Sequence, residues 1–335
     1  MRSELLRPGT LVPLLVFAAL VAVPVFSAAT DQPFWVAFFA RIIIYAIAAS
    51  ALNLALGYGG LVSFGHALFL GMGSYSVAIP AYFGFANGWL HLTVCVLSCA
   101  LVGFLTGIIS LRTKGITFIM ITLAFAQMGY FLFVSLKQFG GDDGISIAQT
   151  SRFLGFDLAS GNVVYAVALA VLMLVTWWMA KLRVSPFGMA LRGAKQNSRR
   201  VDAIGLPVLR YQITAYVISA VLCGIAGLLL ANLNAFASPS TLSWVISGDL
   251  IVMIVLGGIG SVFGPLLGAL AFLGLEEILK SFTEHWMVIF GPIIVMVALV
   301  GKAGIVGVLE HLARRPDARA PAGLVSGAAS TGESR

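Results

Sequence analysis

The sequence predicts an all-α, polytopic membrane protein, and three observations lead to this prediction. Of the 335 residues, 60% are hydrophobic and only 10% are charged, whereas soluble domains carry roughly 25% charged residues. The mean hydropathy is +1.01. Uncharged stretches also recur along the chain, and a bilayer is crossed by about 20 apolar residues. Together these features exclude a water-soluble enzyme, a secreted disulfide-rich domain and a disordered chain.

The uncharged stretches, divided at clusters of Gly, Pro and Asn, give about ten predicted transmembrane helices. A β-barrel is not expected, because the stretches are continuously apolar and do not alternate. The eighth helix is short and contains Asp249. The predicted spans are approximately 10–29, 35–56, 61–84, 89–111, 115–136, 161–181, 211–232, 243–258, 262–281 and 285–302.

The two ends of the chain need separate interpretation. The first span has a basic start and the small residues Ser27, Ala28 and Ala29, as a signal peptide would. Its apolar stretch is longer than the usual 7–15 residues of such a peptide, so a retained helix is expected. Residues 1–310 are predicted to form one transmembrane domain, and residues 311–335, rich in Ala, Gly, Ser and Arg, a disordered cytoplasmic tail.

Basic residues predict how the spans are oriented, because cytoplasmic loops are enriched in Lys and Arg. With a cytoplasmic N-terminus and ten alternating spans, 16 of the 20 basic residues lie on the cytoplasmic side. Of the 13 acidic residues, 8 lie outside. Nine spans would leave the basic C-terminal tail outside. Both termini are therefore expected in the cytoplasm, and the net charge of +7 is attributed to topology, with no nucleic-acid partner.

Two glycine-rich turns, 57–66 and 257–265, have the same form, with Phe before the last Gly. Gly interrupts a helix at a cost of about 1 kcal/mol relative to Ala. Irregular backbone at membrane depth is tolerated only beside protein or a water-filled cavity. Either these turns are broken helices beside a solute path, or they are tight hairpins without a ligand role. Their similarity fits an internal repeat of the kind found in transporters, but the match is short.

The segment 182–210 is too short for a domain and too patterned for a simple tether. Small and apolar residues alternate with basic ones, and Gly205 and Pro207 are expected to end a helix. One interpretation is one or two short helices that dock onto a cytoplasmic partner; the other is a basic loop on anionic lipid headgroups. The docking candidates are Arg192, Lys195, Arg199, Arg200, Asp202 and Gly205.

Charged residues inside spans are costly and indicate function by default. Arg41 and Asp249 both fall in the outer half of their spans and could form an ion pair, although Arg41 could equally snorkel to the interface. His66 could relay protons, but with no carboxylate nearby a hydrogen bond to a carbonyl freed by the helix break is favoured.

Polar residues and turn glycines within the spans are candidates to line a solute path. They could equally form helix-to-helix hydrogen bonds. These candidates are Asn53, Gly59, Gly60, Ser63, Gly65, His66, Thr117, Thr122, Gln127, Gly258, Gly260 and Ser261.

Several kinds of chemistry are not encoded. The sequence has no Gly-x-x-x-x-Gly-Lys-Ser/Thr loop, no His-Glu-x-x-His site and no Gly-x-Ser-x-Gly turn. Cys95, Cys99 and Cys223 are interpreted as apolar packing residues. No cofactor, metal or enzymatic activity is expected. Because no span carries the acidic chain of an ion-driven pump, energy for uphill movement would have to come from a partner through 182–210.

The motifs in order resemble the LivM-type permease subunits of branched-chain amino acid ABC importers. The resemblance covers roughly residues 40–305. It rests on the run Asn53–His66, on Leu111–Phe118 with Ile121–Ala124, on Gly140–Gly144, on Ser185–Gly188 through Gly205, and on Leu256–Ser261.

This resemblance implies the fold of a type II ABC importer permease in a bacterial inner membrane. It implies a second, LivH-type permease, two ATP-binding subunits and an extracytoplasmic solute-binding protein as partners, with Arg192–Gly205 as the coupling segment. The family usually has acidic residues near Asn197, where this chain has Ser198, Arg199 and Arg200. Relatives that carry urea or amides keep that alternative open, and a stand-alone secondary transporter is the less favoured one.

Overall fold

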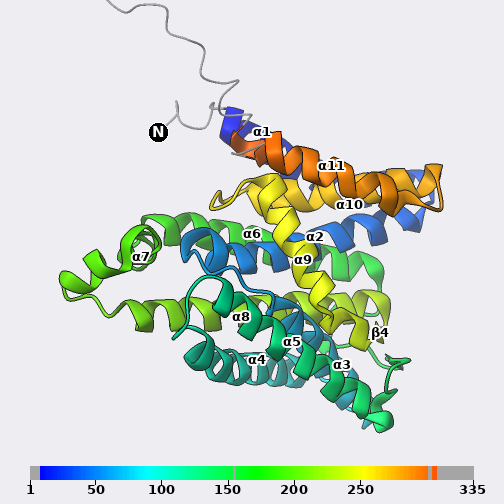
Figure 1. Cartoon of the computed structure of the whole chain (residues 1–335). Coiled ribbons are helices and arrows are strands. Elements are labelled where there is room, and N and C mark those ends of the chain that lie inside the picture. The colour runs from blue at the N-terminus through cyan, green and yellow to red at the C-terminus, as the bar shows by residue number, and fades with distance from the viewer. Residues whose placement is uncertain (1–7, 154–155, 301–303, 308–335) are drawn as a thin grey trace, which may run out of the picture.

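The computed structural model describes residues 8–153, 156–300 and 304–307, and helices dominate it (Figure 1). The α-helices are α1 (Pro8–Thr30), α2 (Pro33–Asn53), α3 (His66–Tyr82), α4 (Gly88–Ser110), α5 (Ile116–Ser135), α6 (Gly161–Val184), α7 (Pro186–Ala203), α8 (Val208–Asn234), α9 (Trp244–Gly257), α10 (Gly264–Phe282) and α11 (Trp286–Val300). The short elements are the π-turn η1 (Leu54–Tyr58), the 3-10 turns η2 (Lys137–Phe139) and η3 (Pro239–Leu242), and the strands β1 (Ile145–Ser146), β2 (Arg152–Phe153), β3 (Phe156–Asp157) and β4 (Phe236–Ala237).

Each of the ten predicted spans coincides with a helix, and α7 occupies the predicted cytoplasmic segment. Five helical segments in the described part are at least 18 residues long and apolar enough to cross a membrane: 33–58, 88–110, 116–135, 161–184 and 208–234. The all-α membrane class is therefore confirmed, and ten crossings remain a prediction. The predicted tail, 311–335, lies outside the described residues.

Helix α2 lies at the centre of the bundle. Every residue from Ile42 to Asn53 is buried, as expected for a helix that is apolar on all faces. Helix α2 packs against α6, α8, α9 and α10. Figure 1 shows α1, α10 and α11 along one side of the bundle and α3, α4 and α5 along the other. Helix α2 therefore lies between these two groups of helices.

Helix α8 contacts α3 and α4 closely because glycines line the seams. A Cβ on Gly227 would lie 1.8 Å from the carbonyl oxygen of Leu70 on α3, so any side chain here would force the helices apart. Small residues allow such close backbone contact between membrane helices. Cys95, Cys99 and Cys223 are buried, unbridged thiols in the core that these helices share, which confirms their packing role.

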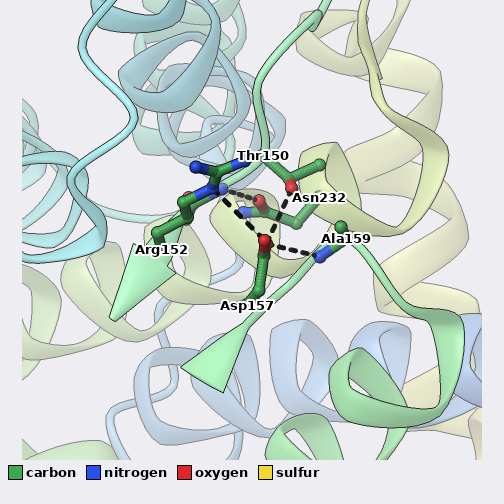
Figure 2. Close-up of polar contacts among 6 residues, drawn as sticks. Thr150, Arg152, Asp157, Ala159 and Asn232 are labelled. Atoms are coloured by element: carbon green, nitrogen blue, oxygen red, sulfur yellow. Dashed lines mark hydrogen bonds and ion pairs between the residues drawn. The ribbon is translucent and has the colours of Figure 1, made fainter. Parts of the chain in front are cut away.

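The opposite end of the bundle from α7 carries a small folded cap, in which β1 pairs with β4 and β2 with β3. Figure 2 shows the polar contacts around Asp157 of β3, whose carboxylate forms an ion pair with Arg152 at 3.2 Å. Beneath it, the Ser151 amide donates to Asn232 of α8 at 2.8 Å, and His91 of α4 bonds the Ser151 hydroxyl at 2.7 Å. The loop that follows α5 is thus attached to α4 and α8.

Candidate functional site: the two glycine-rich turns and helix α7

The two glycine-rich turns lie against each other, although some 200 residues separate them in the sequence. The connection from α2 to α3 starts as the π-turn η1 and then extends to the start of α3 at His66. The α9–α10 turn reaches it so closely that a Cβ on Gly57 would lie 2.8 Å from the backbone nitrogen of Gly260. At both positions one helix ends and another begins, which fits either interpretation of the turns, and α3 begins five residues later than the predicted span.

Asn53 joins the two turns. Its side-chain amide donates to the Ser261 carbonyl at 2.9 Å, and its side-chain oxygen accepts from the Gly260 amide at 2.9 Å. Asn53 is fully buried, and a buried amide left without partners is costly. Its polarity therefore serves to hold the α9–α10 turn against the end of α2.

Lys195 joins α7 to the same place. Its ammonium donates to the carbonyl oxygen of Gly57 at 2.8 Å. The lysine stem crosses Gly60, where a Cβ would lie 2.9 Å from the Lys195 Cγ and where φ is +70°. In a regular α-helix the Leu61 amide would donate to the Gly57 carbonyl. Here it donates to the Ala55 carbonyl instead, so the Gly57 carbonyl is available to accept from Lys195. Gly60 is thus required both by its backbone conformation and by the lysine lying on it.

Helix α7 is two short helices separated by a kink at Asn197, where φ is −156° and ψ is 98°. The Asn197 side-chain oxygen accepts from the Arg200 amide at 3.1 Å and so caps the second piece. The hydroxyl of Ser198 bonds the Lys114 ammonium of the α4–α5 turn at 3.1 Å. The helix ends just before Gly205, which has φ +86°, as the sequence predicts.

The candidate docking residues divide between the two sides of α7. Arg192 turns back to donate to the Arg183 carbonyl at 2.8 Å, and Lys195 points to η1. Arg199, Arg200 and Asp202 are exposed. Two apolar side chains of this segment are also exposed, Met189 at 53% and Ile204 at 74%; the sequence pattern included Ile204 but missed Met189.

The predicted hydrogen bond from His66 to a carbonyl freed by the helix break is not formed; the ring bonds the Ser219 hydroxyl instead. The Ser219 hydroxyl donates to the Ala51 carbonyl at 2.5 Å, so His66 Nε2–H donates to Ser219 at 2.7 Å. The ring is buried between Phe69 and Tyr216. This arrangement gives His66 a structural role beside the helix break, with no carboxylate among its hydrogen-bond partners in the described part of the chain.

The remaining polar candidates fall into two groups. Ser63 accepts from the Gly65 amide at 3.2 Å, and Thr122 accepts from the Phe64 amide at 3.2 Å, so both hold the α2–α3 connection. Thr117 is exposed and Gln127 is partly exposed on α5. The buried residues of α5 are Phe118, Thr122 and Ala126, at helical spacing, so one face of α5 packs on the bundle and the rest faces outward.

The predicted ion pair between Arg41 and Asp249 is not formed. In the described ranges the ion pairs are Arg152–Asp157 and Lys280–Glu276. The guanidinium of Arg41 lies instead over the Tyr45 ring of its own helix, 5.8 Å from the ring centre. An arginine four residues before a tyrosine can reach that ring without crossing to a neighbouring helix.

Interrupted helices that meet within an apolar bundle are typical of membrane transport proteins, and here an amphipathic helix, α7, is attached to them. No group of metal-ligating side chains occurs in the residues that the structure describes. Residues 34–299 match the family described as "Branched-chain amino acid transport system / permease component". The chain belongs to this family.

The relatives agree with this membership. The LivM permease of Escherichia coli (strain K12) is 28% identical over 286 residues, covering 78% of this chain and 67% of that protein. A probable LivM of Methanocaldococcus jannaschii is 26% identical, covering 71% of this chain and 79% of that protein. The E. coli LivH permease is 26% identical, covering 78% and 91%. No solved structure gives a significant match.

Proposed function

We propose that this chain is one of two permease subunits of an ATP-driven importer of branched-chain amino acids in a bacterial inner membrane. The other subunits would be a LivH-type permease, two ATPases and an extracytoplasmic binding protein. The relatives are named as branched-chain amino acid transport permeases of both the LivM and LivH types, which supports a paired permease. The chain itself would carry out no chemical reaction.

The observation that carries this proposal is the attachment of α7 to both broken helices. Lys195 bonds the Gly57 carbonyl, and Gly57 packs against the turn that Asn53 holds. A movement of α7 would therefore be transmitted to the end of α2 and to the α9–α10 turn through these contacts. The exposed surface of α7, with Met189 and Ile204 among basic residues, is of the kind that a separate ATPase would bind.

The proposed orientation places the α7 end in the cytoplasm. It is supported by the concentration of Lys and Arg in α7 and the α4–α5 turn. We place the solute path along the outward face of α5, with Thr117 and Gln127, next to the turns Gly59–Gly65 and Gly258–Ser261. The exposure of Thr117 and the partial exposure of Gln127 on a largely apolar helix support that position.

Reconstitution of the full complex in proteoliposomes tests the proposal. Uptake of radiolabelled leucine should require ATP inside the vesicles, both permeases and the binding protein. Leucine uptake that persists without ATP or by this chain alone would overturn the importer assignment in favour of a secondary transporter. Uptake of urea or short amides, with no uptake of any branched-chain amino acid, would keep the ABC class and reject the substrate.

A further inference from the structure

A cavity of about 580 Å³ lies between the α2–α3 connection, the α4–α5 turn and α7. Its walls are of two kinds. Apolar side chains line one part, including Leu61, Leu111, Phe118 and Ile119, and three cationic side chains line the other, Lys114, Lys195 and Arg199. No Asp or Glu is among the described residues that line it. The cavity is thus both amphipathic and strongly positive.

Among the residues that the structure describes, the cations of this cavity have no acidic partner. Lys114 bonds a serine hydroxyl at 3.1 Å and Lys195 bonds a backbone carbonyl at 2.8 Å, and both partners are neutral. The two ion pairs in the described ranges involve other residues. Like charges held together around one hollow repel each other, and an anion within the hollow relieves this repulsion. The cavity is therefore electrostatically suited to an anionic group.

The apolar part of the cavity wall indicates which kind of anion fits the cavity. Phe118 and Ile119 continue along α5 to Ile116 and Met120, which are 74% and 59% exposed. A ligand with a charged head and an apolar chain would satisfy both parts, whereas a free phosphate or nucleotide would leave the apolar wall uncovered. Basic pockets between membrane helices on the cytoplasmic side are suited to anionic lipid headgroups.

We propose that this cavity binds the phosphate headgroup of an anionic phospholipid from the cytoplasmic leaflet, with the start of an acyl chain against the apolar wall of Leu111, Phe118 and Ile119. The inference uses the orientation given under the proposed function. The bound lipid contacts the side chains that attach α7 to the α2–α3 connection and to the α4–α5 turn. It therefore holds α7 in the attached position. The content of anionic lipid in the membrane then sets how tightly α7 is held against the α2–α3 connection and the α4–α5 turn.

The test measures lipid binding to the full-length chain in detergent by native mass spectrometry, without ATP or partner subunits, so it does not depend on transport. Phosphatidylglycerol should bind, and phosphatidylcholine should bind much more weakly. The double substitution Lys114→Gln with Arg199→Gln removes two charges and should weaken phosphatidylglycerol binding about 30-fold. Arg200→Gln, the same change at the exposed neighbour outside the cavity, should leave binding unchanged.

Thermal melting of each variant in the same detergent checks that it is folded, so lost binding is not confused with unfolding. Equal binding of both lipids, or equal losses in the double variant and in Arg200→Gln, would overturn the site. Competition by millimolar inorganic phosphate as effective as that by phosphatidylglycerol would assign the cavity to a free anion and reject the lipid. Displacement of the lipid by the purified ATPase subunits would assign it to a protein carboxylate instead.

Discussion

Replacing Lys195 by Met tests the connection between α7 and the broken helix. The change keeps an aliphatic stem on Gly60 and removes the ammonium that bonds the Gly57 carbonyl at 2.8 Å. Hydrogen bonds to charged groups contribute about 1.5–3 kcal/mol. Because Lys195 is exposed to solvent, the lower value is appropriate. A loss of about 1.5 kcal/mol shifts the balance between attached and detached α7 roughly tenfold.

The assay is paired measurement of leucine uptake and ATP hydrolysis by the reconstituted complex. Uptake by the Lys195→Met variant should fall roughly tenfold, while ATP hydrolysis continues, because the exposed face of α7 is unchanged. Lys195→Arg should restore much of the uptake, since a guanidinium also donates to a carbonyl. Lys181→Met is the control: its ammonium lies 4.1 Å from the centre of the Trp177 ring, away from both turns. Wild-type uptake by Lys195→Met, or an equal loss in Lys181→Met, would refute the reasoning.

Three further predictions concern stability, each measured by thermal melting of the purified chain. Asn53→Ala removes two buried hydrogen bonds and should destabilise the protein by about 2–3 kcal/mol; an unchanged melting temperature would contradict its role in joining the turns. Gly227→Ala should strongly lower the melting temperature because its Cβ would meet the backbone of α3, whereas Gly274→Ala, which has open space, should be tolerated; similar effects of both would show that α8 can move aside. A double-mutant cycle on Arg152 and Asp157, whose side chains are 68% and 45% exposed, should give a coupling below about 1 kcal/mol, and a larger value would indicate a buried network.

The sequence predicted the helices well because a membrane-spanning helix is identified by the summed hydrophobicity of one continuous segment of the chain. The ten apolar stretches all became helices, including 243–258 despite Asp249. The main difference was the start of α3, which lies at His66 and not near residue 61. Glycines that lower helix stability before this point allow the chain to extend instead. The predicted short helices in 182–210 were also found, with a kink at Asn197.

The site was predicted less completely. The sequence identified Asn53 and Lys195 as polar candidates, but it did not indicate that one holds the α9–α10 turn and the other holds η1. Arg41 and Asp249 were paired on the basis of similar depth alone, and this was wrong. Depth along the membrane is set by position within a span, but the direction of a side chain around the helix axis depends on the neighbours that pack there.

By itself the sequence determined the class of this protein: an apolar helical chain with basic loops at one end and two glycine-rich interruptions. These properties follow from local transfer free energies and backbone preferences, which depend on each residue and its immediate neighbours. Only the tertiary structure decided that the two interruptions meet, that Lys195 bonds the Gly57 carbonyl of η1 and that a positive cavity lies beside α7. Those features depend on distances between residues far apart in the chain, which packing of the whole bundle alone can fix.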